Sequence, residues 1–359
     1  MNLTNEERFR LLKAFNKVKQ SPSKPGDWKE KTNSNILLVD GTNTFIRCWS
    51  ANPAMDENGN HTGGLVGFLK SVGYGIKLLA PTRCIIVFDG VGGSFKRRKI
   101  FPEYKENRKG KIRLNRAYEE MSDAKTEEIQ MRNQFLRLLH YLKTFPVNIL
   151  SIDHVEADDV IAYLATDYFK NSKKVYIMSS DKDFLQLCTG NICVYSPTKK
   201  RIYGPVEVLN EYQIHPNNFV LFRALDGDAS DNIDGIKLAG LKTIIKHFPW
   251  LSEEKIYSAN EIISRAEELK DKYKVCENIV SNKSIIDRNI SLMQLRDTSL
   301  STIAQLHCNE CLETEKIPRL ERGAFYKLVR EDMIESILPN HVSWAEGVFG
   351  LLDGVIRSD

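Results

Sequence analysis

Nine carboxylates in four groups are the residues of this chain best suited to do chemistry. They are Asp40; Asp89; Glu156, Asp158 and Asp159; and Asp181 and Asp183 with Asp228 and Asp231. Apolar runs at 36–39, 84–88 and 175–180 precede three of these groups, and each run is typical of a buried strand. Because open α/β sheets bind ligands beyond the carboxyl ends of their parallel strands, we expect the acids to share one cleft.

So many like charges in one cleft are unfavourable unless something neutralises them. Two carboxylates about 4 Å apart repel by roughly 4 kcal/mol at an effective dielectric constant near 20. The acids would therefore either take up protons or bind cations. Mg²⁺ and Mn²⁺ prefer oxygen ligands and often bridge protein carboxylates to substrate phosphates. The pattern favours a divalent-metal site over a set of solvated aspartates at strand ends.

The composition is typical of an intracellular globular enzyme. The 359 residues, 42% of them hydrophobic, can form one large domain or two ordinary ones. With no apolar run of about 18 residues and no signal-peptide pattern, we expect a cytoplasmic protein without membrane association. Seven scattered cysteines argue against a disulfide framework. The spacing His307-Cys308-Asn309-Glu310-Cys311 lacks a second ligand pair, so we interpret it as ordinary cysteines rather than a zinc site.

Positive charge is concentrated in one segment, although the net charge is only +4. Residues 96–116 contain ten Lys or Arg and two Glu, and the aromatic residues Phe95, Phe101 and Tyr104 lie among them. Basic residues set beside stacking surfaces are typical of proteins that hold single-stranded nucleic acid. We therefore favour a phosphate-binding segment over a solvated loop.

The hydrophobic pattern divides the chain into three regions. Residues 1–34 are an N-terminal extension and linker, with an amphipathic helix at 4–20 opened by a Thr4-x-x-Glu7 capping box. From 35 to 205 strands alternate with helices, expected at 62–79, 117–143 and 157–169, which indicates a doubly wound α/β domain. Residues 206–359 are expected to be helical throughout.

Five motifs in order along residues 35–250 resemble those of the structure-specific 5′-nucleases. This family includes the 5′-nuclease domain of bacterial DNA polymerase I and the bacteriophage 5′-exonucleases, flap endonucleases and RNase H enzymes. The similar motifs are Leu38-Val39-Asp40-Gly41-Thr42 with Phe45 and Arg47; Val87-Phe88-Asp89 with Phe95 and Tyr104-Lys105-x-x-Arg108; residues 154–161, HVEADDVI; residues 180–184, SDKDF; and residues 227–233, GDASDNI.

The resemblance implies a PIN-like 5′-nuclease fold. Its parts would be a mainly parallel twisted sheet flanked by helices, a helical arch at about 95–116, and a helix-hairpin-helix at about 232–248 within the helical region. The sequence departs from the family pattern at two positions. Lys96 stands where the family usually has Arg, which replaces a bidentate phosphate contact by a point charge. Leu238 stands where the hairpin usually has Gly.

The resemblance also implies two Mg²⁺ ions, for which Mn²⁺ can substitute. It assigns Asp40, Asp89, Glu156, Asp158, Asp159 and Asp181 to one ion, and Asp183, Asp228 and Asp231 to the other. A metal-activated water would attack the phosphodiester while the second ion stabilises the leaving 3′-oxygen, which leaves a 5′-phosphate and a 3′-hydroxyl. The catalytic residues would be Asp40 and Asp89, with Lys105 and Arg108 offsetting charge on the reacting phosphate.

The expected substrates are DNA flaps, nicks or 5′ ends, and RNA primers in RNA:DNA hybrids, in replication or repair. The expected nucleic-acid-binding residues are Arg47, Lys96, Arg97, Tyr104, Lys109, Lys111, Arg113, Gly235, Gly240 and Lys242. Tyr104 would stack on or wedge the nucleic acid, with core packing as its alternative. We expect a monomer, which would act in the host cytoplasm if a phage encodes it.

Three alternatives concern the function and the partners. A PIN-type ribonuclease shares strand-end acids, but the GDASDN segment, the hairpin and the basic arch argue against it. A non-catalytic protein that binds branched DNA does not need all nine acids. The apolar stripe of Trp344, Val348, Phe349, Leu352 and Val355, like the N-terminal helix, could dock a single-strand-binding protein or sliding clamp. Packing on the protein's own small domain is the favoured reading.

Overall fold

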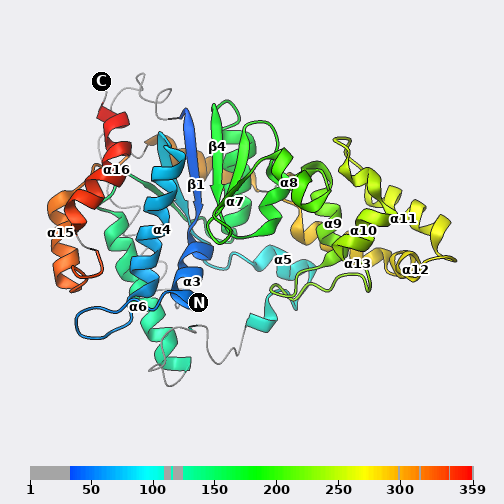
Figure 1. Ribbon diagram of the computed structural model, residues 1–359, viewed down its shortest axis with the longest axis horizontal. Coiled ribbons are helices and arrows are strands. Elements are labelled where there is room, and N and C mark those ends of the chain that lie inside the picture. Colours follow the sequence, from blue (N-terminus) through cyan, green and yellow to red (C-terminus); the bar gives the residue numbers. More distant parts are fainter. Residues whose placement is uncertain are drawn as a thin grey trace. The chain divides into compact units, whose positions relative to one another are not determined.

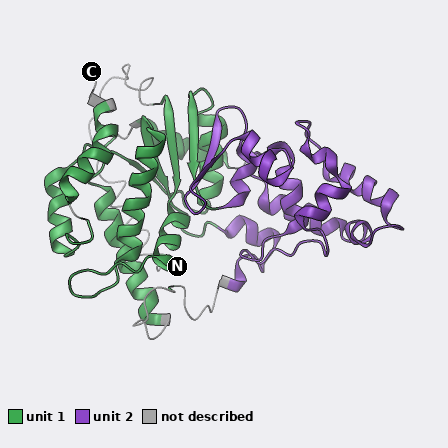
Figure 2. Ribbon diagram, viewed as in Figure 1, with its two compact units in different colours: residues 1–93, 111–180, 300–359 green, residues 94–110, 181–299 purple. Residues whose placement is uncertain are grey.

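The computed structural model describes residues 33–108, 115, 124–297, 300–314, 317–338 and 340–357. The chain forms two compact units, each built from discontinuous segments (Figure 2). Unit 1 contains residues 1–93, 111–180 and 300–359, and unit 2 contains residues 94–110 and 181–299. The expected domain division at residue 205 stays a prediction; the compact units instead group residues 94–110 with 181–299, and residues 300–359 belong to the α/β unit.

A parallel sheet forms the centre of unit 1 (Figure 1). Its strands are β1 (Asn35–Asp40), β2 (Arg83–Val87), β3 (Asn148–Leu150) and β4 (Lys174–Met178), in the order β3-β2-β1-β4. Residues 36–39 of β1 and 84–87 of β2 are fully buried. Because successive side chains of a strand point to opposite faces, both faces of the sheet are covered, as expected for parallel strands.

Helices cover this sheet and one another. The helices of unit 1 are α3 (Gly41–Ala51), α4 (Gly63–Leu79), α6 (Ala124–Leu142), α7 (Ala157–Tyr163), α14 (Thr302–Thr314), α15 (Arg322–Glu331) and α16 (His341–Arg357). Both α4 and α7 pack on β1, and α6 packs on α4. A wider turn, Leu164–Tyr168, extends α7 to nearly the expected end of that helix.

The apolar stripe of α16 packs on its own unit. The Phe349 ring stacks on Phe145 with centroids 3.9 Å apart, and the side chains of Val348, Phe349 and Leu352 are buried. A side chain on Gly73 of α4 would lie only 3.0 Å from the Trp344 ring, so glycine permits the close approach of α16 to α4. These residues therefore pack on the protein itself, as favoured, but on the α/β unit rather than on a small domain. The Val355 side chain and the expected helix at 4–20 lie outside the described residues.

Unit 2 is mainly helical. The antiparallel strands β5 (Ile192–Ser196) and β6 (Arg201–Tyr203) form a hairpin in it. Its helices are α5 (Phe95–Ile100), α8 (Pro205–Tyr212), α9 (Phe219–Asp226), α10 (Leu241–His247), α11 (Ala259–Leu269), α12 (Lys274–Ser281) and α13 (Lys283–Met293). Short 3₁₀ turns lie at Glu106–Arg108, Lys182–Leu187, Pro216–Asn218 and Pro249–Ser252. Among the described residues, every regular element after Pro205 is helical, as expected.

The expected helix at 62–79 is confirmed as α4, whereas the one at 117–143 is described only from residue 124. The strands β3, β5 and β6 and the helix α3 were not singled out from the sequence. In the described part of the chain, no helix is both long and apolar enough to span a membrane.

A buried polar network in unit 1 is centred on His61. Its Nε2 lies 2.7 Å from the carbonyl oxygen of Asn52, and its Nδ1 lies 3.2 Å from the side-chain nitrogen of Gln134. The Asn115 amide lies 3.1 Å from Nε2 and also donates to the carbonyl of Trp49 at 2.6 Å. A neutral ring that donates from Nε2 to Asn52 and accepts at Nδ1 from Gln134 fits these two partners. The Asn115 amide is satisfied by the Trp49 carbonyl rather than by the ring. Burial lowers the pKa of His61.

The network predicts a pH-dependent stability. Because the folded pKa of His61 lies below the unfolded value of about 6.5, its contribution is present above that pH and is lost as the pH falls below it. When the pH is lowered from 7.5 to 5.5, the unfolding free energy of His61→Gln should fall by about 1 kcal/mol less than that of the wild type, measured by urea denaturation. His307→Gln, at an exposed position, is the control. Equal losses for all three proteins would contradict the prediction.

Candidate active site

The acids of unit 1 lie at the carboxyl end of its sheet. Asp40 ends β1 and pairs in register with Val87, while the neighbouring Val39 pairs with Met178, the last residue of β4. The Asp40 side chain is buried and accepts hydrogen bonds from the Asn43 amide at 3.0 Å and the Ser179 hydroxyl at 2.9 Å. The bond to Asn43 caps α3, so helix and strand together fix this carboxylate.

Asp89 lies beyond the end of β2 and joins the same edge. Its backbone amide donates to the Thr42 hydroxyl at 3.2 Å, and its carboxylate accepts from the Ala157 amide at 2.8 Å. Ala157 is the first residue of α7, and Glu156, which is buried, is the residue that precedes this helix. Asp158 and Asp159 occupy its first turn. The expected meeting of these two strand ends is therefore confirmed within unit 1, with the VEADD segment bonded to Asp89.

The acids of unit 2 are organised around Arg223 of α9. Its Nε lies 2.7 Å from a carboxylate oxygen of Asp183, and its Nη2 lies 2.6 Å from one of Asp228. Ser230 donates its amide at 2.8 Å and its hydroxyl at 2.7 Å to the other oxygen of Asp228. Asp181 accepts from the Asp183 amide at 2.8 Å and so caps the short 182–187 helix.

The two acids that bind Arg223 differ in acidity. Burial raises the pKa of Asp183, and the adjacent guanidinium of Arg223 opposes this rise. Burial also acts to raise the pKa of Asp228, but the hydrogen bonds from Ser230 and the charge of Arg223 outweigh it and lower that pKa. The pKa of Arg223 is raised by the charges of its acidic neighbours. All three groups are therefore held as a network of opposite charges.

The base of the basic segment is tied to the GDASDN loop within unit 2. The Tyr104 hydroxyl donates to the Asp231 carboxylate at 3.1 Å, and the Lys105 ammonium lies 3.9 Å from the same carboxylate. The Asn107 amide donates to the carbonyl of Ala229 at 2.6 Å. Tyr104 is only 2% exposed, which fits core packing, the alternative to stacking on nucleic acid. Stacking on a nucleotide would require this segment to rearrange.

The remaining basic residues differ in how accessible they are. Lys96 is exposed, whereas Arg97 is buried and its Nε donates to the carbonyl of Leu292 at 2.8 Å. The buried Arg97 side chain therefore anchors α5 within unit 2 and does not face a substrate phosphate. Arg47 donates to the Ser71 hydroxyl at 2.8 Å on α4. Lys109, Lys111, Arg113 and the side chain of Arg108 lie outside the described residues.

The donor set fits a hard divalent cation by its chemistry, because carboxylate oxygens are the ligands that such ions prefer. The described side chains do not, however, include three or more acids, histidines or cysteines already arranged as a ligand set. Within each unit the acids are bonded to protein groups: Asp40 to Ser179, Asp89 to the first amide of α7, and Asp183 and Asp228 to Arg223.

The expected hairpin lies between α9 and α10. At Gly235, any side chain would lie 2.2 Å from the carbonyl oxygen of Asp226, so packing requires glycine there. Gly240 precedes α10 and has open space around it, and Lys242 is exposed. Leu238 has a φ of +70° and its side chain is 56% exposed, so this leucine adopts the left-handed conformation that favours glycine.

The conformation of Leu238 predicts an unusual response to glycine. Relief of the left-handed strain, about 1–2 kcal/mol, offsets the backbone entropy cost of glycine, about 0.5–1 kcal/mol. Leu238→Gly should therefore raise the unfolding free energy by up to about 1 kcal/mol, measured by urea denaturation. Leu351→Gly, at a similarly exposed position inside α16, should lower it by about 1 kcal/mol. A comparable loss in both variants would refute the strain.

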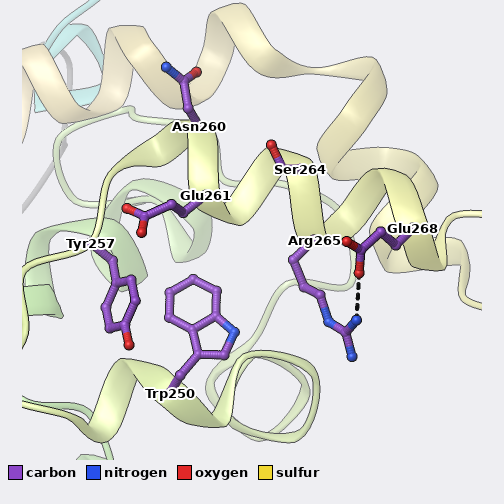
Figure 3. A pocket seen from close by; sticks show the side chains of 7 residues that line it. All are labelled: Trp250, Tyr257, Asn260, Glu261, Ser264, Arg265 and Glu268. Atoms are coloured by element: carbon purple, nitrogen blue, oxygen red, sulfur yellow. Dashed lines mark hydrogen bonds and ion pairs between the residues drawn. The ribbon is translucent and has the colours of Figure 1, made fainter.

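A pocket of about 440 Å³ lies beside α11 in unit 2 (Figure 3). Trp250 and Tyr257 form one side, with ring centroids 4.3 Å apart, and Asn260, Glu261, Ser264, Arg265 and Glu268 of α11 form the other. The Arg265 guanidinium pairs with Glu268 at 2.6 Å. None of these seven residues belongs to the acid motifs.

The cysteine pair of the His307–Cys311 segment, which lies in the described part of the chain, is not arranged as a metal site. In α14, Cys308 is buried and burial raises its thiol pKa to about 12, which is typical of a core cysteine.

The sequence profile of the family "5′-3′ exonuclease, N-terminal resolvase-like domain" matches residues 35–213. A 5′-3′ exonuclease of Buchnera aphidicola is 33% identical over 215 residues, which are 59% of this chain and 69% of the relative. A 5′-3′ exonuclease of Aquifex aeolicus is 28% identical over 84% of this chain and 93% of its own length. DNA polymerase I of Mycobacterium tuberculosis is 27% identical over 86% of this chain, which is 32% of the polymerase.

Among solved structures, the T5 D15 protein co-crystallised with metal ions has a TM-score of 0.58. It is 22% identical, and the match covers 83% of this chain and 98% of that one. A pseudo-enzyme-product complex of the T5 D15 flap endonuclease with DNA and metal ions also has a TM-score of 0.58, at 21% identity.

The parallel sheet with its strand-end acids therefore has the PIN-like 5′-nuclease fold. The chain is a member of the 5′-3′ exonuclease family, and its activity is that of a 5′-nuclease.

Several residues that shape the site were not found from the sequence. Arg223, Ser179 and Thr42 all bond to the motif acids or to their backbone. Thr42 and Ser179 lie within or beside the quoted motifs, but nothing in their type distinguished them from surface residues. Arg223 precedes Asp228 by five residues in an apolar helix, and a lone arginine in such a helix is the signal that could have been followed.

Proposed function

We propose that this 5′-nuclease uses divalent metal ions, two Mg²⁺ or Mn²⁺ ions as the resemblance implies, to hydrolyse phosphodiester bonds at flaps, nicks and 5′ ends. The observation that carries this proposal is the convergence of Asp40 and Asp89 on one sheet edge, where Asp89 also caps α7 of the VEADD segment. Parallel α/β sheets bind ligands at this edge. Metal ions and DNA in the T5 D15 structures support the same reading.

The acids would hold the ions in the two sets that the resemblance assigns. Asp40, Asp89, Glu156, Asp158, Asp159 and Asp181 form the first set, and Asp183, Asp228 and Asp231 form the second. Bound ions of this kind activate water and stabilise a leaving oxygen. The chain itself would supply orientation, because Ser179 and the start of α3 fix Asp40 while α7 fixes Asp89.

Lys105 and Arg108 would act on the substrate rather than on the ions. The Lys105 ammonium lies 3.9 Å from Asp231, so this cation is already placed beside one of the acids of unit 2. A substrate phosphate drawn to that position would meet a positive charge that offsets the charge of the transition state. Lys96, Lys109, Lys111 and Arg113 would hold more distant phosphates of the same strand.

The biological setting that we propose is replication or repair, since relatives of this chain include DNA polymerase I. RNA primers in RNA:DNA hybrids are a further proposed substrate. The same proposal includes a single-strand-binding protein or a clamp as partner, and a monomeric state. It also includes action in the cytoplasm, which would be that of the host if a phage encodes the chain.

Removal of a motif acid should abolish turnover without abolishing DNA binding. Asp89→Ala and Asp183→Ala should each lower kcat by at least about 10³-fold, because the lost ligand supplies both the nucleophile and charge stabilisation. Binding of a flap substrate in Ca²⁺ should persist. Asp153→Ala, at an exposed acid beyond β3, should retain activity. Full activity in EDTA, or in either mutant, would overturn the metal-dependent mechanism.

The substrate proposal is tested with labelled flap, nicked and RNA:DNA substrates of one sequence, compared side by side. Faster cleavage at an unpaired 5′ end than on single strands or blunt duplex would support structure specificity. Equal cleavage of single-stranded RNA would instead favour the PIN-type ribonuclease.

The basic segment should separate into residues that act on the rate and residues that act on binding. Lys105→Ala or Arg108→Ala should lower kcat by roughly 10²-fold, about 2.7 kcal/mol, through loss of a transition-state contact. Lys109→Ala, Lys111→Ala or Arg113→Ala should mainly weaken binding and reduce the salt slope by about 0.7 per lost contact. Small, equal effects on KM in all five variants would mean that the segment supplies only diffuse charge.

Threading of the strand is a separate question. If the 5′ end passes through the arch, a bulky protein attached to that end should block cleavage of the flap. Unchanged cleavage of the blocked flap would refute threading and leave the metal chemistry intact.

A further inference from the structure

Arg223 lies where the motif acids of unit 2 meet. Its side chain is 5% exposed, and its guanidinium contacts Asp183 at 2.7 Å, Asp228 at 2.6 Å and Asp226 at 3.4 Å. The same group donates to the carbonyl of Gly227 at 2.9 Å. The guanidinium thus bonds through Nε to Asp183 of the S-x-D-x-D motif and through Nη2 to Asp228 of the GDxSDN motif, two acids that are 45 residues apart in the sequence.

The contacts explain how acids of one sign can lie close together before a metal ion arrives. Asp183 and Asp228 would repel each other across a short distance in a partly buried site. The guanidinium supplies the compensating charge, and its rigid planar fork fixes the separation of the two carboxylates. A surface ion pair would do neither, because solvent would screen it.

We propose that Arg223 is a positioning residue that substitutes for part of the metal charge, holding Asp183 and Asp228 in register in the metal-free enzyme. This inference rests on the proposed function, in which the two acids face a divalent ion. Arg223 contacts no substrate in this role and acts only through the two carboxylates.

The proposal has a thermodynamic consequence that an ordinary buried ion pair does not have. Without Arg223, the metal-free state retains uncompensated acids, whereas the metal-bound state has an ion to compensate them. Removal of the arginine therefore destabilises the metal-free state more, and by linkage the site binds a divalent ion more tightly. The acids would no longer be held in register, so turnover would fall even as binding tightens.

The test compares Arg223→Gln and Arg223→Lys with the wild type in the full chain. In EDTA, Arg223→Gln should melt about 10 °C lower, since an acid loses its buried partner. Ca²⁺, which allows binding without turnover, should restore most of this loss. Titration calorimetry should show Ca²⁺ binding at least about tenfold tighter, at the site that Asp183→Asn removes. Arg223→Lys, which keeps the charge but not the fork, should lie between the two.

Arg137 offers a matched control in unit 1. It bridges Asp332 at 2.8 Å and Glu331 at 2.7 Å, in the same two-acid arrangement but outside the motifs. Arg137→Gln should lower the melting temperature without changing the Ca²⁺ affinity or the shift that Ca²⁺ produces. The comparison distinguishes the loss of an ordinary ion pair from the loss of a cation that compensates the same acids as a metal ion would.

A compensating variant keeps the proposal testable if Arg223→Gln does not fold in EDTA. Arg223→Gln/Asp228→Asn removes one negative charge with the positive one, so it should melt closer to the wild type and lose the tightened Ca²⁺ binding. Unchanged Ca²⁺ affinity in Arg223→Gln and Arg223→Lys would overturn the role of Arg223. A wild type whose turnover needs no divalent ion would overturn the proposed function itself.

Discussion

Like charges crowded at strand ends repel, and the fold holds several of these acids with hydrogen-bond donors. Asp40 is held by the Asn43 amide and the Ser179 hydroxyl, and Asp89 by the first amide of α7. In unit 2 the arginine of α9 holds Asp183 and Asp228. Without these donors, the acids would protonate or turn toward solvent, and neither unit could present a defined set of carboxylates.

The same requirement explains why remote segments are combined in each unit. The base of the basic segment, residues 94–110, belongs to unit 2 because Tyr104, Lys105 and Asn107 bond to the loop at 228–232. Lys105 and Asp231, which we propose to act on the substrate and on a metal ion, are thereby held close together, with the ammonium 3.9 Å from the carboxylate. A change in that loop is therefore expected to affect both functions.

The family match covers residues 35–213, and the described structure beyond it adds further buried apolar side chains. The helices α15 and α16 cover α4 and α6 through Phe325, Phe349 and their neighbours, and so they complete the core of unit 1. The apolar stripe of α16 is thus part of the core of unit 1. The Leu238 conformation shows similarly that the hairpin keeps its glycine-like backbone even with leucine in place.

The sequence by itself determined the family and the elements with the strongest hydrophobic pattern, whereas β3, β5, β6 and α3 were not singled out. Apolar runs that end in acids predicted β1, β2 and β4, because burial on both faces leaves a continuous hydrophobic signature, and the order of the motifs predicted the family. Tertiary structure decided what local pattern cannot encode. The partners of the acids, such as Arg223 forty residues from Asp183, are fixed by packing between segments distant in sequence. The return of residues 300–357 to unit 1 and the burial of Tyr104 depend on the same long-range packing, which no single-segment periodicity records.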